Sequence, residues 1–149
     1  MADLHHVPGE PHKSTVQERS ISHPYPLGPT VTPEGTNFSV FSATATGMEI
    51  VLFDHVDSLQ SARVIRLDPD RDRTSHYWHI FVPEVRSGQL YGYRAYGPEN
   101  SSSGHRFDSQ KVLIDPYGKS VAVGKLYSRT AASQPGDNAA FAMKSVVAD

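Results

Sequence analysis

The chain has 149 residues, which is the size of one domain with a buried core. Its formal net charge of −2 excludes the basic surface that is typical of proteins binding nucleic acid or anionic membranes. It has no cysteine, which excludes disulfides and cysteine-ligated zinc. No apolar run approaches the roughly 18 residues of a membrane span. Eleven prolines, eleven glycines and few helix-forming runs favour an all-β class.

The first 21 residues are polar and show no hydrophobic periodicity, so they are predicted to form a disordered tail. They contain no apolar core of a signal peptide. His5, His6 and His12 are scattered through this stretch. Scattered histidines of this kind are typical of a solvated tail rather than of a metal site.

Short apolar stretches separated by turn residues predict the strands that follow. Residues 48–53 are apolar on both faces, which predicts a central strand or one covered on its outer face. Six residues, PEVRSG, separate the fourth predicted strand from the fifth, and this spacing predicts a hairpin. The pattern favours an immunoglobulin-like β-sandwich of about six to eight strands, with a small barrel as the alternative. The predicted strands are residues 36–42, 48–53, 63–67, 77–82 and 89–96.

The character of the sequence changes after a short apolar run that stops at Asp115-Pro116. Residues 128–140 are small and polar, as in a linker or a segment that needs a partner to become ordered. We therefore expect a module at 22–118 and a loop-rich linker at 119–149. The chain turns apolar again from Phe141 and then stops, which we expect of a fragment of a longer protein.

The chain holds one partial match to a metal-binding loop and no complete catalytic motif. Asp68, Asp70 and Asp72 match the first three ligand positions of a calcium loop, but Arg73 and His79 stand where that loop needs glycine and glutamate. A solvated charged turn is the better interpretation. No motif for a nucleophile with its base or for a metalloprotease is present, so no catalytic residue and no metal ligand is assigned.

The aromatic residues around the predicted hairpin have two interpretations. An exposed row of rings would form a platform for sugars, whereas a buried row would be sandwich core. Composition favours the core or a contact between domains. The candidate carbohydrate-binding residues are Trp78, Tyr91 and Tyr93.

A series of stretches in order resembles the N-terminal β-domain of isoamylase-type glycogen-debranching enzymes, members of the α-amylase superfamily. The resemblance covers roughly residues 22–149. The stretches are YPLG at 25–28, GTNFSVFS at 35–42, IVLFD at 50–54, WHIFVP at 78–83, GQLYGYR at 88–94, GHRFD at 104–108, KVLIDPYGK at 111–119 and KSVVAD at 144–149.

The resemblance implies an immunoglobulin-like module of the carbohydrate-binding class. In full-length relatives a (β/α)₈ barrel of about 250 residues follows and hydrolyses α-1,6 branch linkages of glycogen or amylopectin. The nucleophile and general acid belong to that barrel, so this chain alone is expected to be catalytically inert and to need no cofactor. The implied partners are the chain's own catalytic barrel and α-glucan, and the implied location is the cytoplasm, or the plastid stroma in a plant.

One departure from the class concerns sugar binding. For glycogen-binding members, such as the β subunit of AMP-activated protein kinase, the resemblance implies a sugar-binding platform built from two surface tryptophans and a lysine. This chain has one tryptophan, Trp78, and Gly92 stands where the lysine is expected. We therefore expect weak or no independent glucan binding. The alternatives are an independent glycogen- or starch-binding module and an immunoglobulin-like scaffold without a sugar ligand.

A second group of residues is predicted to tie the chain down where the barrel would begin. These residues lie on the fifth predicted strand and on the loop that follows it. The candidate junction residues are Arg94, Arg106, Phe107, Lys111, Asp115 and Tyr117.

Overall fold

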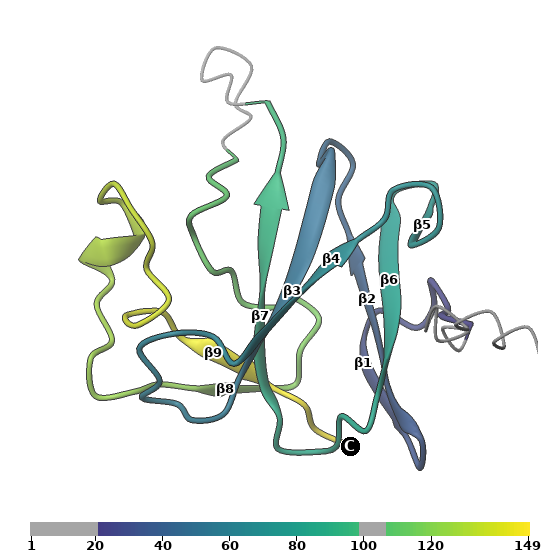
Figure 1. Cartoon of the computed structure of the whole chain (residues 1–149), viewed down its shortest axis with the longest axis horizontal. Coiled ribbons are helices and arrows are strands. Elements are labelled where there is room, and N and C mark those ends of the chain that lie inside the picture. Colours follow the sequence, from purple (N-terminus) through teal and green to yellow (C-terminus); the bar gives the residue numbers. More distant parts are fainter. Residues whose placement is uncertain (1–20, 99–106) are drawn as a thin grey trace, which may run out of the picture.

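The computed structural model describes residues 21–98 and 107–149. The predictions for residues 1–20 and for Arg106 lie outside the described residues. Two antiparallel sheets face each other (Figure 1). Among the residues that the structure describes, no helix is long and apolar enough to cross a membrane. The two facing sheets confirm the predicted β-sandwich.

The two sheets have four and five strands. The four-stranded sheet has the order β1 (Gly28–Thr32), β2 (Gly35–Phe41), β6 (Tyr77–Pro83) and β5 (Arg73–Thr74). The five-stranded sheet has the order β4 (Arg63–Leu67), β3 (Gly47–Phe53), β7 (Leu90–Tyr96), β9 (Lys144–Val146) and β8 (Ser120–Ala122). A single 3₁₀ turn, η2 (Thr130–Ala132), lies between β8 and β9.

The main core lies between the sheets because every second side chain of β2 and β6 in one sheet, and of β3 and β7 in the other, points inward, and most of these side chains are apolar. The ring of Phe38 on β2 meets the ring of Tyr91 on β7 edge to face, with 4.9 Å between centroids. All five predicted strands are present, with each end within one residue of the prediction.

The prediction for β3 is also confirmed. β3 lies between β4 and β7, and it is apolar on both faces. Its residues Val51 and Phe53 point away from the main core and pack against Val112, Ala139 and Ala142. The outer face of the five-stranded sheet is thus covered by a later part of the same chain.

The predicted hairpin of β6 and β7 is wrong. β6 pairs with β2 and β7 pairs with β3, so the connection crosses from one sheet to the other. Glu84 and Gly88 have positive φ values of 66° and 97° within this crossing, and Val85 is buried in the core. The spacing of two strands in sequence does not reveal whether they pair or face each other across a core.

Residues 119–149, predicted as a linker outside the module, contribute two strands to the five-stranded sheet. β9 pairs with β7 through Leu90 and Tyr91, and β8 pairs with β9. The backbone of Val147 also bonds to that of Gly88 and Gln89, at 2.8 and 2.9 Å. The module therefore extends beyond residue 118.

Candidate functional site

The three rings predicted to bind carbohydrate lie in the core. Trp78 and Tyr91 are 0% exposed and Tyr93 is 3% exposed. A buried ring offers no face to a sugar. Their burial agrees with the core interpretation that composition favours, and the three candidate residues form no exposed platform. Among the described buried side chains, the indole N–H of Trp78 and the hydroxyl of Tyr93 have no hydrogen-bond partner.

Gly92 lies on the outer face of β7 directly under the segment that follows Phe107. A Cβ atom on Gly92 would lie 2.5 Å from Cγ1 of Val112 and 3.0 Å from the carbonyl oxygen of Leu113. The backbones of Tyr93 and Leu113 exchange hydrogen bonds of 2.9 and 2.7 Å beside this contact. Only a residue without a side chain allows this approach, so the position has no room for a lysine.

Asp115 is the centre of a buried polar network. Its Oδ2 accepts a 2.7 Å hydrogen bond from the hydroxyl of Tyr91, and its Oδ1 accepts one of 2.9 Å from the N–H of Tyr117. Its own N–H donates to Oγ of Ser145 on β9, at 2.8 Å. Burial raises the pKa of the Asp115 carboxyl above its usual value, although the hydrogen bonds from Tyr91 and Tyr117 oppose the rise.

Arg94 holds two later segments against β7. Its guanidinium donates to the carbonyl oxygens of Ser109 and Gln110, at 3.3 and 2.8 Å. It also donates to both carboxylate oxygens of Asp137, at 2.9 and 3.0 Å. Such a two-point contact fixes orientation as well as distance.

Lys111 is buried, and its ammonium group binds backbone carbonyls. Nζ donates to Ala131 and Gly136 at 3.0 and 2.6 Å, and also to Gln134. Since an ammonium group carries three N–H bonds, the three carbonyls satisfy it. The loop at residues 131–136 is therefore folded around this side chain.

The remaining described junction candidates have more modest roles. Phe107 packs at the edge of the main core and lies against Gly97. Tyr117 is exposed, and its carbonyl oxygen lies 2.6 Å from where a Cβ on Gly28 would be. The structure thus brings Arg94, Lys111 and Asp115 together as internal anchors of one segment. Their partners Asp137 and Ser145 were not singled out from the sequence.

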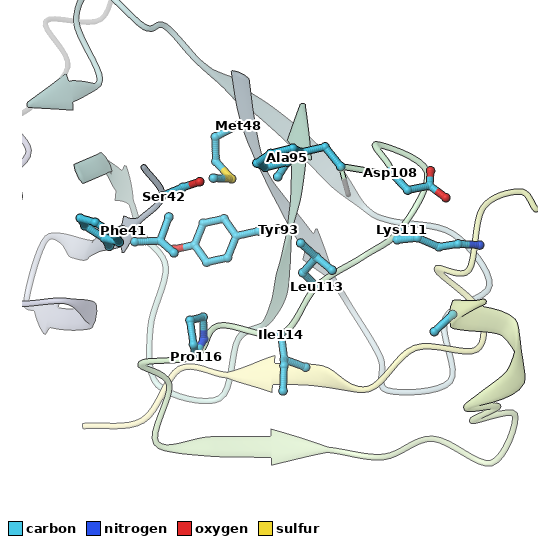
Figure 2. Close-up of a pocket in the computed structure, with 13 residues that line it drawn as sticks. Phe41, Ser42, Met48, Tyr93, Ala95, Asp108, Lys111, Leu113, Ile114 and Pro116 are labelled. Carbon is cyan, nitrogen blue, oxygen red and sulfur yellow. The ribbon is translucent and has the colours of Figure 1, made fainter. Parts of the chain in front are cut away.

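A pocket of about 800 Å³ opens between the end of β2, β7 and the segment at 107–116. Figure 2 shows the phenol ring of Tyr93 at its centre, with Phe41 and Ser42 on one side and Leu113 on the other. Its walls are mostly apolar, and its polar residues are Ser42, Asp108 and Lys111. Among the described residues, no group of three or more histidines and carboxylates is placed to hold a metal ion.

Comparisons with known proteins agree with this architecture. The family described as carbohydrate-binding module 48 (isoamylase N-terminal domain) matches residues 26–118. Isoamylase 1, chloroplastic, from Arabidopsis thaliana is 42% identical over 100 residues, which are 66% of this chain and 13% of that protein. A glycogen debranching enzyme from Yersinia enterocolitica is 41% identical over 129 residues, which are 83% of this chain and 19% of that protein.

The solved structures show the fold alone. A pullulanase from Bacillus acidopullulyticus superposes with a TM-score of 0.57 at 16% identity, over 83% of this chain and 12% of that one. The chain thus spans less than a fifth of each of these relatives. With its matching sequence and its sandwich of two sheets, the chain belongs to the carbohydrate-binding module 48 family, the isoamylase N-terminal domain.

Proposed function

We propose that the chain is the accessory module of an enzyme that hydrolyses α-1,6 branch linkages of glycogen, amylopectin or limit dextrin. Its main task is to support the catalytic barrel, and its own affinity for α-glucan is weak. The names of the relatives, an isoamylase and a glycogen debranching enzyme, support the parent activity. The bacterial and chloroplastic origins of these relatives support a cytoplasmic or plastid location.

The contact of Gly92 with Val112 carries the proposal. The outer face of β7 is occupied by the chain's own segment, and Trp78 is inside the core. Neither position can contribute to the sugar-binding platform of two rings and a lysine that is expected in glycogen-binding members. Sugar binding depends on exposed ring faces, so loss of such a platform removes the main source of affinity.

Two measurements on the isolated chain test the proposal. In ¹⁵N NMR titrations with maltoheptaose, we expect shifts that do not saturate at millimolar ligand. We also expect no release of reducing sugar from glycogen. Saturation at micromolar ligand would overturn the supporting role, and hydrolysis would overturn the assignment as an accessory module.

An independent glucan-binding module is the second candidate, and one observation favours it. Phe41 is 42% exposed, and its ring meets those of Tyr77 and His76 with centroids 5.4 and 6.0 Å apart. If this cluster binds sugar, Phe41→Ala abolishes the shifts induced by maltoheptaose. Leu59→Ala, at another exposed apolar position, is the matched control and leaves them unchanged.

A further inference from the structure

The five-stranded sheet extends past the four-stranded sheet on the side of β8. Figure 1 shows β8 and β9 on the left, away from β1, β2, β5 and β6. Tyr91 of β7 is opposite Ser145 of β9, which is in turn opposite Val121 of β8. Residues directly opposite each other share a face. Since Tyr91 packs on Phe38 of the other sheet, Val121 lies on the inward face.

This inward face is uncovered at β8. Tyr91, Ser145 and Val121 lie side by side across three neighbouring strands. Tyr91 is in the core, but Val121 is 45% exposed. An ordinary sandwich covers such a position with a strand of the opposite sheet. Here the covering layer stops at Asp115, whose N–H bonds to Ser145. The last strand of the sheet is therefore left with one apolar face open.

Further exposed apolar side chains belong to the same stretch of chain as Val121. Residues 113–123 contain five large apolar residues that are 39–56% exposed. Leu113 and Ile114 also line the pocket (Figure 2), and the next residue, Asp115, bonds to Ser145 of β9. We call this surface the apolar edge, and its members are Leu113, Ile114, Tyr117, Val121 and Val123.

The apolar edge has the features of an interface. Several large apolar side chains exposed within eleven residues and an unpaired edge strand favour association with another protein surface. Lys119 and Lys125 flank β8 and are exposed, so a complementary surface would be apolar with acidic groups at its rim. A sugar chain, which needs many polar contacts, fits this surface poorly.

We propose that the apolar edge is the surface on which the α-glucan-hydrolysing catalytic domain docks. This inference rests on the proposed function, which supplies that domain. The relative from Yersinia enterocolitica aligns with 83% of this chain but has 81% of its own length outside the alignment, as 100 − 19 gives. Most of that relative therefore lies outside the module.

A chimera tests the proposal in a complete enzyme. The matching N-terminal part of the Yersinia enterocolitica enzyme is replaced by this chain, and Val121→Glu and Ile114→Glu are introduced separately. Val64→Glu is the matched control because Val64 is also on an edge strand, β4, and is 49% exposed. Each variant is also made in the isolated chain, where its melting temperature shows whether the module itself still folds.

We expect Val121→Glu and Ile114→Glu to lower debranching activity of the chimera several-fold while Val64→Glu leaves it unchanged. Hydrogen exchange should show residues 113–123 protected in the chimera relative to the isolated chain, with residues 63–67 unaffected. Equal effects of all three variants in an active chimera, or protection at another surface alone, would overturn the docking surface and leave the proposed function standing. A folded chimera with neither activity nor protection would overturn both.

Two further outcomes point to other occupants. Dimerisation of the isolated chain that Val121→Glu abolishes would assign the apolar edge to a second copy. Shifts on maltoheptaose addition confined to residues 113–123 would assign it to sugar. Either result overturns docking of the catalytic domain at this surface.

Discussion

The hydroxyl of Tyr91 and the carboxylate of Asp115, 24 positions apart in sequence, are joined by a 2.7 Å hydrogen bond inside the protein. Through this bond the central strand β7 holds the segment around Asp115, which connects β7 to β8. The bond from Asp115 to Ser145 then continues the connection to β9. Asp115 thus links β7 to β9, through its carboxylate on one side and its backbone N–H on the other.

Tyr91→Phe should destabilise the chain by about 1–3 kcal/mol, because it removes the donor to a buried carboxylate oxygen. Urea unfolding followed by tryptophan fluorescence measures the change in unfolding free energy. Tyr77→Phe is the control, since Tyr77 is partly exposed and its strand pairing is unaffected by loss of the hydroxyl. Equal stability of the two variants would show that the bond to Asp115 contributes nothing.

The raised pKa of Asp115 predicts a dependence of stability on pH. Because its folded pKa lies above the unfolded value, the native state binds more protons between the two values. The contribution of Asp115 to stability is therefore present below the unfolded pKa and is lost as pH rises through the folded pKa. Asp115→Asn should remove this decline. Urea unfolding at a series of mildly acidic pH values checks it, and an unchanged slope in the variant would contradict the assignment.

Gly92→Ala should cost about 1–3 kcal/mol because its Cβ has no space beside Val112, and overpacking is destabilising. Val112→Ala, which removes the Cγ1 atom in question, should recover part of that loss in the double variant. A double-mutant cycle of unfolding free energies measures the coupling between the two positions. Strictly additive losses would mean that Val112 does not limit the space above Gly92.

Lys111→Met should loosen the loop at residues 131–136, since its three carbonyls lose their shared donor. The methionine keeps much of the apolar length of the side chain, so the sandwich itself should remain folded. Hydrogen exchange should rise in this loop and stay unchanged in β2 and β6. Lys119→Met, at an exposed lysine, is the control. Unchanged exchange in the Lys111 variant would indicate that the loop is held by other contacts.

Strand alternation in the sequence was enough to predict the central strands. The three-residue strands β8 and β9 were missed because they are too short to show alternation. The wrong hairpin has a different cause, since β6 and β7 are neighbours in sequence but belong to different sheets. Composition favours burial of the aromatic residues, and Trp78 and Tyr93 are in the core. Spacing alone does not separate a buried ring from an exposed one, because an aromatic residue on a strand has the same spacing on either face.

Three of the junction candidates have partners inside the module. Arg94, Lys111 and Asp115 are charged residues close to apolar strands, and such residues need partners when buried. Their partners could not be predicted, because Asp137 lies 43 positions from Arg94 and Ser145 lies 30 positions from Asp115. Long-range pairing of this kind depends on the tertiary fold.

The covering of Phe53 and Val51 by Ala139 and Ala142 bears on where the module can be cut. The family match ends at residue 118, but a chain shortened there would lack β8, β9 and this cover. The start of β7, at Leu90 and Tyr91, would then be an unpaired sheet edge beside an exposed apolar face, a combination that promotes aggregation. The limit of shared sequence is therefore not the limit of the folding unit, and residues 119–149 should be kept whenever the module is transplanted.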